Sequence, residues 1–190
     1  MRGNTMHTGS YMRRGLLAAL LLISLGPVAA HAQFKGTIEQ VMEEMNDFVV
    51  ENNTFQIVRA KPLHIRLSPQ ILTLNAPERI NEEVLRAAVY GVYRTFIHTD
   101  QPQVQVTAQP LFITLNPRSA KVLDAPRASV TVTRDKALQV AKQNLGVKGF
   151  KELVNSDDTW SDKMQNGRYI NRKPGLLKVA QDLGIVFVAK

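Results

Sequence analysis

The chain contains no cysteine. Disulfide bonds, thiol catalysis, thiolate metal sites and haem attachment through cysteine are therefore all excluded. It also lacks a glycine-rich phosphate loop, a G-x-S-x-G elbow and an H-E-x-x-H motif, which removes the most direct signatures of catalysis. Long apolar runs are scarce too. Only residues 16–25 form one, and ten residues are too few to span a bilayer, which takes about 20.

That single apolar run belongs to a typical secretory signal peptide. Arg13-Arg14 precedes it, and Ala30-His31-Ala32 places small residues where a signal peptidase cuts. Residues 1–32 are therefore predicted to be removed, with cleavage before Gln33. The mature chain is expected to be soluble, periplasmic or secreted, and without a membrane span. Its 158 residues suffice for one domain with a core.

Charge is distributed unevenly along the chain, whose formal net charge is +8. Residues 1–32 hold three arginines and no acid, so +5 remains after their removal. Residues 33–133 are balanced, whereas 134–190 contain eleven basic and six acidic residues. Any attraction to polyanions is thus expected in this basic C-terminal third, where a solvated basic face is the simpler explanation. Export makes nucleic acid an unexpected partner.

An internal repeat is the strongest structural signal. Residues 58–69 (VRAKPLHIRLSP) and 106–117 (VTAQPLFITLNP) share seven of twelve positions at an offset of 48. The match extends backward without a gap to 41–69 and 89–117. This predicts a duplicated helix-loop-strand unit.

Periodicity predicts an α+β or mixed α/β single domain. Helices are expected at 38–52, 77–97, 135–145 and 175–183, with a short piece at 150–154 and later strands at 130–132 and 185–188. Alternation within the repeat predicts that one set of strand residues points into the core: Leu63, Ile65, Leu67, Leu111, Ile113 and Leu115. The slip in this alternation at Gln109-Pro110 indicates a bulge. The small residues Ala88 and Gly91 predict a close approach to the second helix.

Two histidines remain after the predicted cleavage. His98 and Asp100 follow each other at the end of a predicted helix and are weak catalytic candidates, although a histidine there also suits the helix dipole. His64 lies on the strand face opposite Leu63 and is expected to be at the surface or half-buried.

Acidic residues gather in the polar stretch 155–173. Asp157, Asp158 and Asp162 are weak candidates for a cation site, but their spacing does not match an EF-hand loop. We therefore expect no metal and no cofactor.

The same stretch combines aromatic rings with cations. Trp160, Arg168, Tyr169, Arg172 and Lys173 are predicted to form a binding surface, because such residues often anchor interfaces. The alternative is that Trp160 and Tyr169 pin the loop to the body of the protein.

These observations favour an exported bacterial envelope protein that acts as a non-enzymatic binding or assembly module. Its partner would be an envelope protein or polymer, bound through the bulged strands or the 155–173 loop. Two alternatives from other classes remain. One is an envelope-polymer hydrolase or lyase with a site near His98, Asp100 and the acidic loop, and the other is a periplasmic small-ligand binder.

Overall fold

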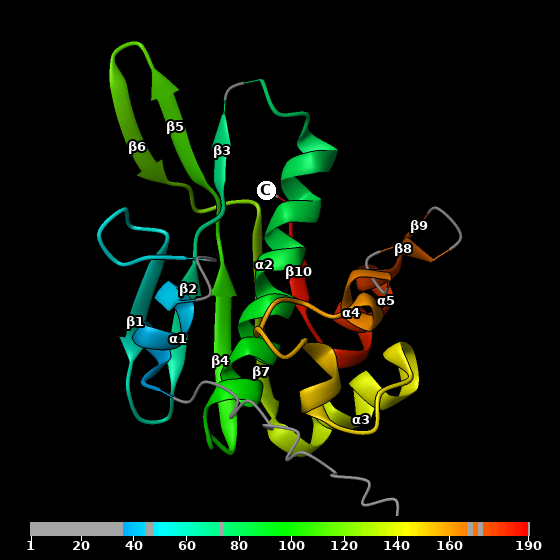
Figure 1. Cartoon of the computed structure of the whole chain (residues 1–190). Coiled ribbons are helices and arrows are strands. Elements are labelled where there is room, and N and C mark those ends of the chain that lie inside the picture. The colour runs from blue at the N-terminus through cyan, green and yellow to red at the C-terminus, as the bar shows by residue number, and fades with distance from the viewer. Residues whose placement is uncertain (1–35, 45–47, 73, 167–168, 171–172, 190) are drawn as a thin grey trace, which may run out of the picture. The chain divides into compact units, whose positions relative to one another are not determined.

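A mixed five-stranded sheet, here called the body sheet, lies at the centre of an α+β fold (Figure 1). Its order is β1 (Phe55–Arg59), β2 (His64–Leu67), β4 (Gln103–Ala108), β7 (Arg127–Thr133) and β10 (Val186–Val188). Only β2 and β4 are parallel, and the other neighbours run antiparallel.

The computed structural model describes residues 36–44, 48–72, 74–166, 169–170 and 173–189. The predicted signal peptide and its cleavage site lie outside these residues. Within the described part, no helix has both the length and the apolar character needed to cross a bilayer.

The long helix α2 (Pro77–His98) packs across β2, β4 and β7. It begins with a proline in its first turn, where no amide donor is needed. A Cβ at Gly91 would overlap with Cδ1 of Leu67 and lie 3.1 Å from Cγ1 of Val106. The predicted close approach is confirmed, and it brings the helix backbone down onto the sheet.

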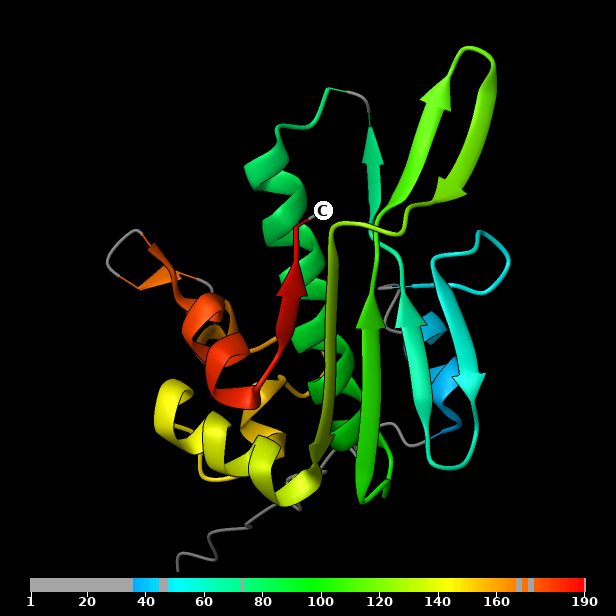
Figure 2. The same ribbon diagram turned by 180° about the vertical axis from the view of Figure 1, so that it is seen from behind.

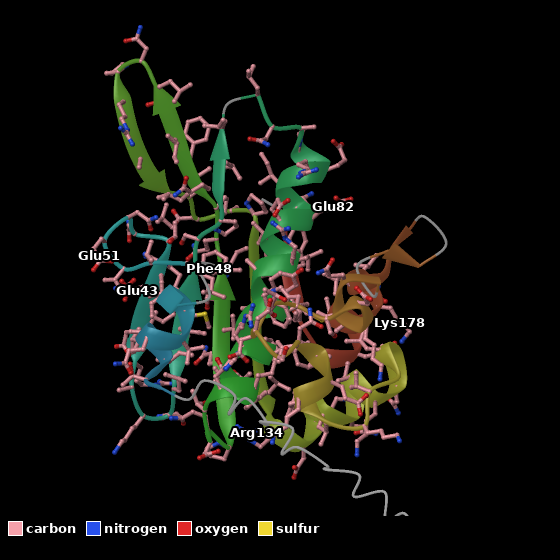
Figure 3. All side chains as sticks on the ribbon, viewed as in Figure 1. Glu43, Phe48, Glu51, Glu82, Arg134 and Lys178 are labelled. Carbon is pink, nitrogen blue, oxygen red and sulfur yellow. The ribbon has the colours of Figure 1, made fainter. Side chains whose placement is uncertain are left out.

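The C-terminal end of α2 is closed by Arg134, which Figure 3 labels at the opposite end of the fold from β5 and β6. Its guanidinium donates to the carbonyls of Phe96 at 2.7 Å and Gln101 at 3.1 Å. Helix carbonyls that would otherwise lack a partner are satisfied in this way.

The remaining helices are α1 (Ile38–Glu44), α3 (Arg134–Leu145), the 3₁₀ helix η1 (Phe150–Leu153), α4 (Asp162–Asn166) and α5 (Gly175–Leu183). Thr37 and Gln40 form a capping box at the start of α1, since Thr37 N–H donates to Gln40 Oε1 at 2.9 Å. Gly146 and Gly184 end α3 and α5 with φ of 64° and 84°.

The first helix is shorter than predicted. The sequence indicated a helix over 38–52, but residues 49–54 form a tight turn instead. The Thr54 hydroxyl accepts the Val49 N–H at 2.8 Å, and Asn53 takes a φ of 62°. The apolar pair Phe48 and Val49 continued the helical pattern, but local hydrogen bonds favour the turn.

One face of the body sheet is covered by helices and the other is open (Figure 2). Cross-strand register places Gln56, Arg66, Thr107 and Ser129 in one row on the open face. None of these residues is buried, which is the pattern of a sheet with one solvated face.

A second, three-stranded sheet extends beyond the body sheet, and we call it the projecting sheet. Its order is β3 (Gln70–Leu72), β5 (Leu111–Leu115) and β6 (Arg118–Val122). β2 leads into β3 at Pro69, and β4 leads into β5 at Pro110, so two parallel strands pass from one sheet into the other (Figure 1). The slip in alternation at Gln109-Pro110 corresponds to this passage between sheets, and the prediction of a bulge within one strand is wrong.

The predicted duplication is not confirmed. Segments 41–69 and 89–117 share the order helix, strand, strand, but their strands are connected differently. β1 and β2 reverse around Pro62 and pair as an antiparallel hairpin. β4 and β5 instead continue in one direction through Pro110 and belong to different sheets. The sequence similarity therefore does not correspond to a common strand arrangement.

The core prediction is correct for the body and for Leu111 at the start of β5, and it is wrong for the rest of β5. Leu63, Ile65, Leu67 and Leu111 are buried, as expected. Ile113 is only half-buried, and Leu115 is 75% exposed. Alternation correctly placed these residues on one face, but it could not show whether anything covers that face.

Candidate binding surface

The projecting sheet has one apolar face. Residues directly opposite each other on neighbouring strands point to the same side. Leu72 lies opposite Ile113, which in turn lies opposite Ala120. By the same register, the residues on this face are Gln70, Leu72, Leu111, Ile113, Leu115, Arg118, Ala120 and Val122.

This apolar face is exposed toward its tip. Leu72 is 44% exposed and Leu115 is 75% exposed, whereas Ile71 on the opposite face is 3% exposed. Leu74, just beyond β3, is 96% exposed. Apolar side chains gathered on one exposed face are typical of an interaction site rather than of a random surface.

The outer strand of the sheet, β6, leaves backbone groups available. Leu123 N–H donates to the Pro110 carbonyl at 2.9 Å, so Leu123 faces β5. Backbone groups alternate in direction along a strand, which points the N–H and C=O groups of Arg118, Ala120 and Val122 away from β5. No other described strand pairs with this edge.

The edge of β6 is basic. Arg118 and Lys121 are both exposed, and neither forms an ion pair with a described residue. An isolated surface ion pair contributes little binding free energy. Two cationic side chains on one short strand together favour an acidic ligand.

The histidine and loop candidates meet elsewhere, around a buried arginine. Arg94 on α2 is 3% exposed, and its Nη1 lies 3.4 Å from Nε2 of His98 and donates to the Asp158 carbonyl at 2.7 Å. Arg94 thus connects His98 with the main chain of the acidic loop, near which the enzymatic alternative placed its site. His98 is fully buried, however, so a substrate has no access to it in this arrangement. Asp100, beyond the helix, is exposed.

Trp160 is a buried part of the same cluster. It is 9% exposed, its ring centroid lies 4.5 Å from that of Tyr90, and the guanidinium of Arg94 lies 3.9 Å above it. This placement favours the alternative that Trp160 pins the loop to the body. Its indole nitrogen has no hydrogen-bond partner in the part of the chain that the structure describes.

The other proposed loop contacts are not described at side-chain level. Arg168 and Arg172 lie outside the described residues. Tyr169 and Lys173 contribute backbone to β8 (Tyr169–Ile170) and β9 (Lys173–Pro174), which form a two-stranded ribbon. The binding role of these four residues stays a prediction.

The acidic residues shape the loop. Asp157 accepts hydrogen bonds from the Thr159 hydroxyl at 2.7 Å and the Thr159 N–H at 3.2 Å, and these bonds lower the pKa of the Asp157 carboxyl. Asp158 adopts a φ of 59°, and Asp162 begins α4. Among the described residues, no three metal-binding side chains gather.

His64 lies on the open face of the body sheet and is half-buried, as predicted. Its Nε2 lies 2.9 Å from the Thr107 hydroxyl. Partial burial, and to a smaller extent the charge of Arg59, lower the pKa of its imidazole. These contacts hold the ring on the sheet.

Comparison with known proteins assigns no family to this chain. No family model matches it, and neither does any curated protein or any solved structure.

Proposed function

We propose that this chain is an exported, non-enzymatic binding module that takes up an extended segment of a bacterial envelope protein on its projecting sheet. The observation that carries the proposal is the open edge of β6 beside an exposed apolar face. Strand addition uses both features, because the edge supplies backbone hydrogen bonds and the face supplies contacts for alternate side chains.

The chemistry of the incoming segment follows from the strand beside it. Alternate residues should be apolar, so that they extend the face formed by Leu72, Ile113 and Leu115. Acidic residues should lie near Arg118 and Lys121, where they would meet two exposed positive charges that form no ion pair with a described residue. Binding of this kind weakens as salt rises.

The sequence of residues 1–32 supports the export part of the proposal. Its basic start, apolar run and Ala30-His31-Ala32 site match a signal peptide. Intact mass of the protein recovered from the periplasm or medium should correspond to a chain that begins at Gln33. A full-length mass, or protein found only in the cytoplasm, would contradict export.

An enzymatic role near His98 has less support. The imidazole is fully buried beside Arg94, and general acid–base catalysis needs direct reach to a substrate. A substrate could reach His98 only if the residues that bury it moved. The outward-facing backbone groups of β6 can be reached without such a rearrangement.

Site-specific photo-crosslinking in the exporting cell tests the docking site. A photo-reactive residue replaces Arg118 on the β6 edge or, as a control, Lys142 on α3. Both native residues are basic and exposed. We expect one discrete adduct from position 118 and none from position 142.

A second variant ties that adduct to strand pairing. Ala120→Pro removes an N–H that points away from β5, so the internal ladder should survive. The adduct should disappear while the circular dichroism spectrum and melting midpoint stay unchanged. Similar adducts from both positions, or a full-strength adduct in the folded proline variant, would overturn the proposal.

A further inference from the structure

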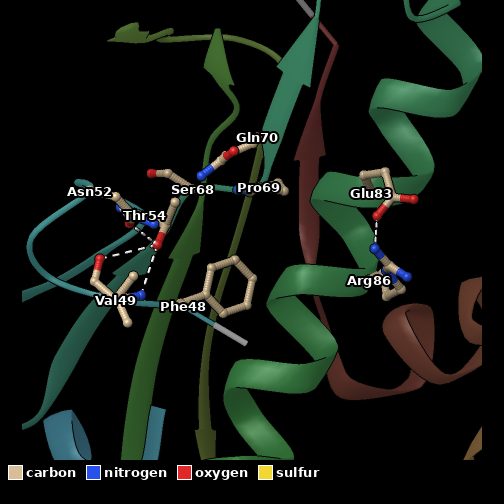
Figure 4. A pocket seen from close by; sticks show the side chains of 9 residues that line it. All are labelled: Phe48, Val49, Asn52, Thr54, Ser68, Pro69, Gln70, Glu83 and Arg86. Carbon is tan, nitrogen blue, oxygen red and sulfur yellow. Dashed lines mark hydrogen bonds and ion pairs between the residues drawn. The ribbon is translucent and has the colours of Figure 1, made fainter. Parts of the chain in front are cut away.

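A pocket with a volume of about 380 Å³ lies where the two sheets meet beside α2 (Figure 4). This is within the usual range of small-ligand pockets, about 300–1,000 Å³. Three segments line it: the turn after α1, the bend between β2 and β3, and one face of α2. The lining residues are Phe48, Val49, Asn52, Thr54, Ser68, Pro69, Gln70, Glu83 and Arg86.

The first two walls are held together by hydrogen bonds. The Thr54 hydroxyl accepts the Val49 N–H at 2.8 Å, which closes the turn. Ser68 N–H donates to the Thr54 carbonyl at 2.7 Å, which joins the turn to the bend. Because these hydrogen bonds already order the wall, ligand binding loses little conformational entropy there.

Several polar groups in these walls lack protein partners. Asn52 uses its oxygen to accept from Thr54, but its amide nitrogen makes no hydrogen bond with the described chain. The Gln70 side chain, which is exposed, makes no hydrogen bond with a described residue, and the buried Ser68 hydroxyl has no partner among these residues either. The wall therefore offers both donors and acceptors without a charge.

The charges on the α2 wall are already matched. The Glu83 carboxylate, 14% exposed, forms ion pairs with Arg86 and, at 3.3 Å, with Arg79. A charged ligand would compete with these internal pairs, whereas an uncharged one leaves them intact. Phe48 and Pro69 add an apolar surface, and Figure 4 shows the Phe48 ring between the turn and α2.

We infer that this pocket binds a small uncharged ring compound rich in hydroxyl groups, of the monosaccharide class. Each hydroxyl donates and accepts, which matches the amides of Asn52 and Gln70. The C–H face of the ring packs on Phe48 and Pro69. No residue of β6 lines this pocket, so the sugar proposal and the strand-docking proposal can be tested independently.

Isothermal titration calorimetry with four probes tests the inference. Glucose and N-acetylglucosamine are the neutral probes, and glucuronate and glucosamine are their charged counterparts. We expect saturable millimolar binding of at least one neutral sugar, with its charged counterpart at least several-fold weaker. No saturable heat from either neutral sugar, or stronger binding of a charged one, would overturn the inference.

Two glutamine variants locate the site. Gln70→Ala removes an exposed side chain that makes no hydrogen bond with a described residue. It should weaken the affinity for the sugar about 2- to 10-fold, the usual effect of one hydrogen bond. Gln56→Ala, an exposed glutamine on β1 away from the pocket, is the matched control and should change nothing. Equal affinities for wild type and Gln70→Ala would place the sugar elsewhere and contradict the assignment.

Discussion

The same two strand paths are buried in the body sheet and exposed in the projecting sheet. In the body, Ile65 and Val106 are fully buried beneath α2. Beyond the bends at Pro69 and Pro110, Leu72 and Leu115 are 44% and 75% exposed. An apolar side chain that stays in contact with water contributes little to folding. The difference indicates that the body sheet contributes most to the stability of the fold, and it leaves the apolar face of the projecting sheet available for the intermolecular contact that we propose.

Trp160→Ala should give the largest loss of stability, because it removes the ring between Tyr90 and Arg94 that holds the loop on the body. Truncation of a buried tryptophan costs about 3–5 kcal/mol. A thermal melt should show a midpoint several degrees lower. An unchanged midpoint together with the loss of an envelope partner would restore Trp160 as a binding residue.

Ile65→Ala tests the body side of the comparison directly. The Ile65 side chain is fully buried among its neighbours. Its truncation should lower the free energy of unfolding in urea by about 2–5 kcal/mol. Leu115→Ala is the matched control and should change stability by less than about 0.5 kcal/mol. Equal losses for the two variants would remove the distinction between the sheets.

Gly91→Ala tests the close approach of α2 to the body sheet. The added methyl group would meet Leu67 and Val106 in a filled core, and overpacking costs about 1–3 kcal/mol. Ala88→Gly removes a buried methyl group from the same helix and serves as a comparison. If Gly91→Ala were as stable as wild type in urea, Leu67 would have room to move and the packing would be looser than described.

The smallest expected effect is a pH dependence from His64 on the open face. Its folded-state pKa is lowered, so the unfolded chain binds the proton more tightly. Stability should be greatest above the unfolded value of about 6.5 and should fall as pH decreases from there toward the lower folded-state pKa. His64→Gln should flatten this part of the pH profile in urea unfolding. An unchanged profile would assign the dependence to another group.

The sequence predicted best what depends on local signals. The ends of α3 and α5 lie within a residue of the predicted bounds, because Gly146 and Gly184 stop each helix by their own backbone preference. Strand β6 was missed, since RSAKV lacks an apolar alternation, and its pairing with β5 defines it instead.

The candidate site could be predicted only in part. Periodicity correctly grouped Ile113 and Leu115 with Leu111, but coverage of a face depends on the path of the whole chain. Trp160 suggested a binding surface because an aromatic side chain suits an interface and a core equally well. Only its contacts with Tyr90 and Arg94 separate the two.

The central claim is that the exposed face of the projecting sheet contributes to partner binding and little to folding stability. Leu115→Asp tests this claim most directly when stability and docking are measured on the same protein. A carboxylate at this 75% exposed position should leave the urea midpoint nearly unchanged. The adduct from the photo-reactive residue at position 118 should be lost, because the charge disrupts the apolar face. A large loss of stability, or an adduct of undiminished strength in the folded variant, would contradict the account.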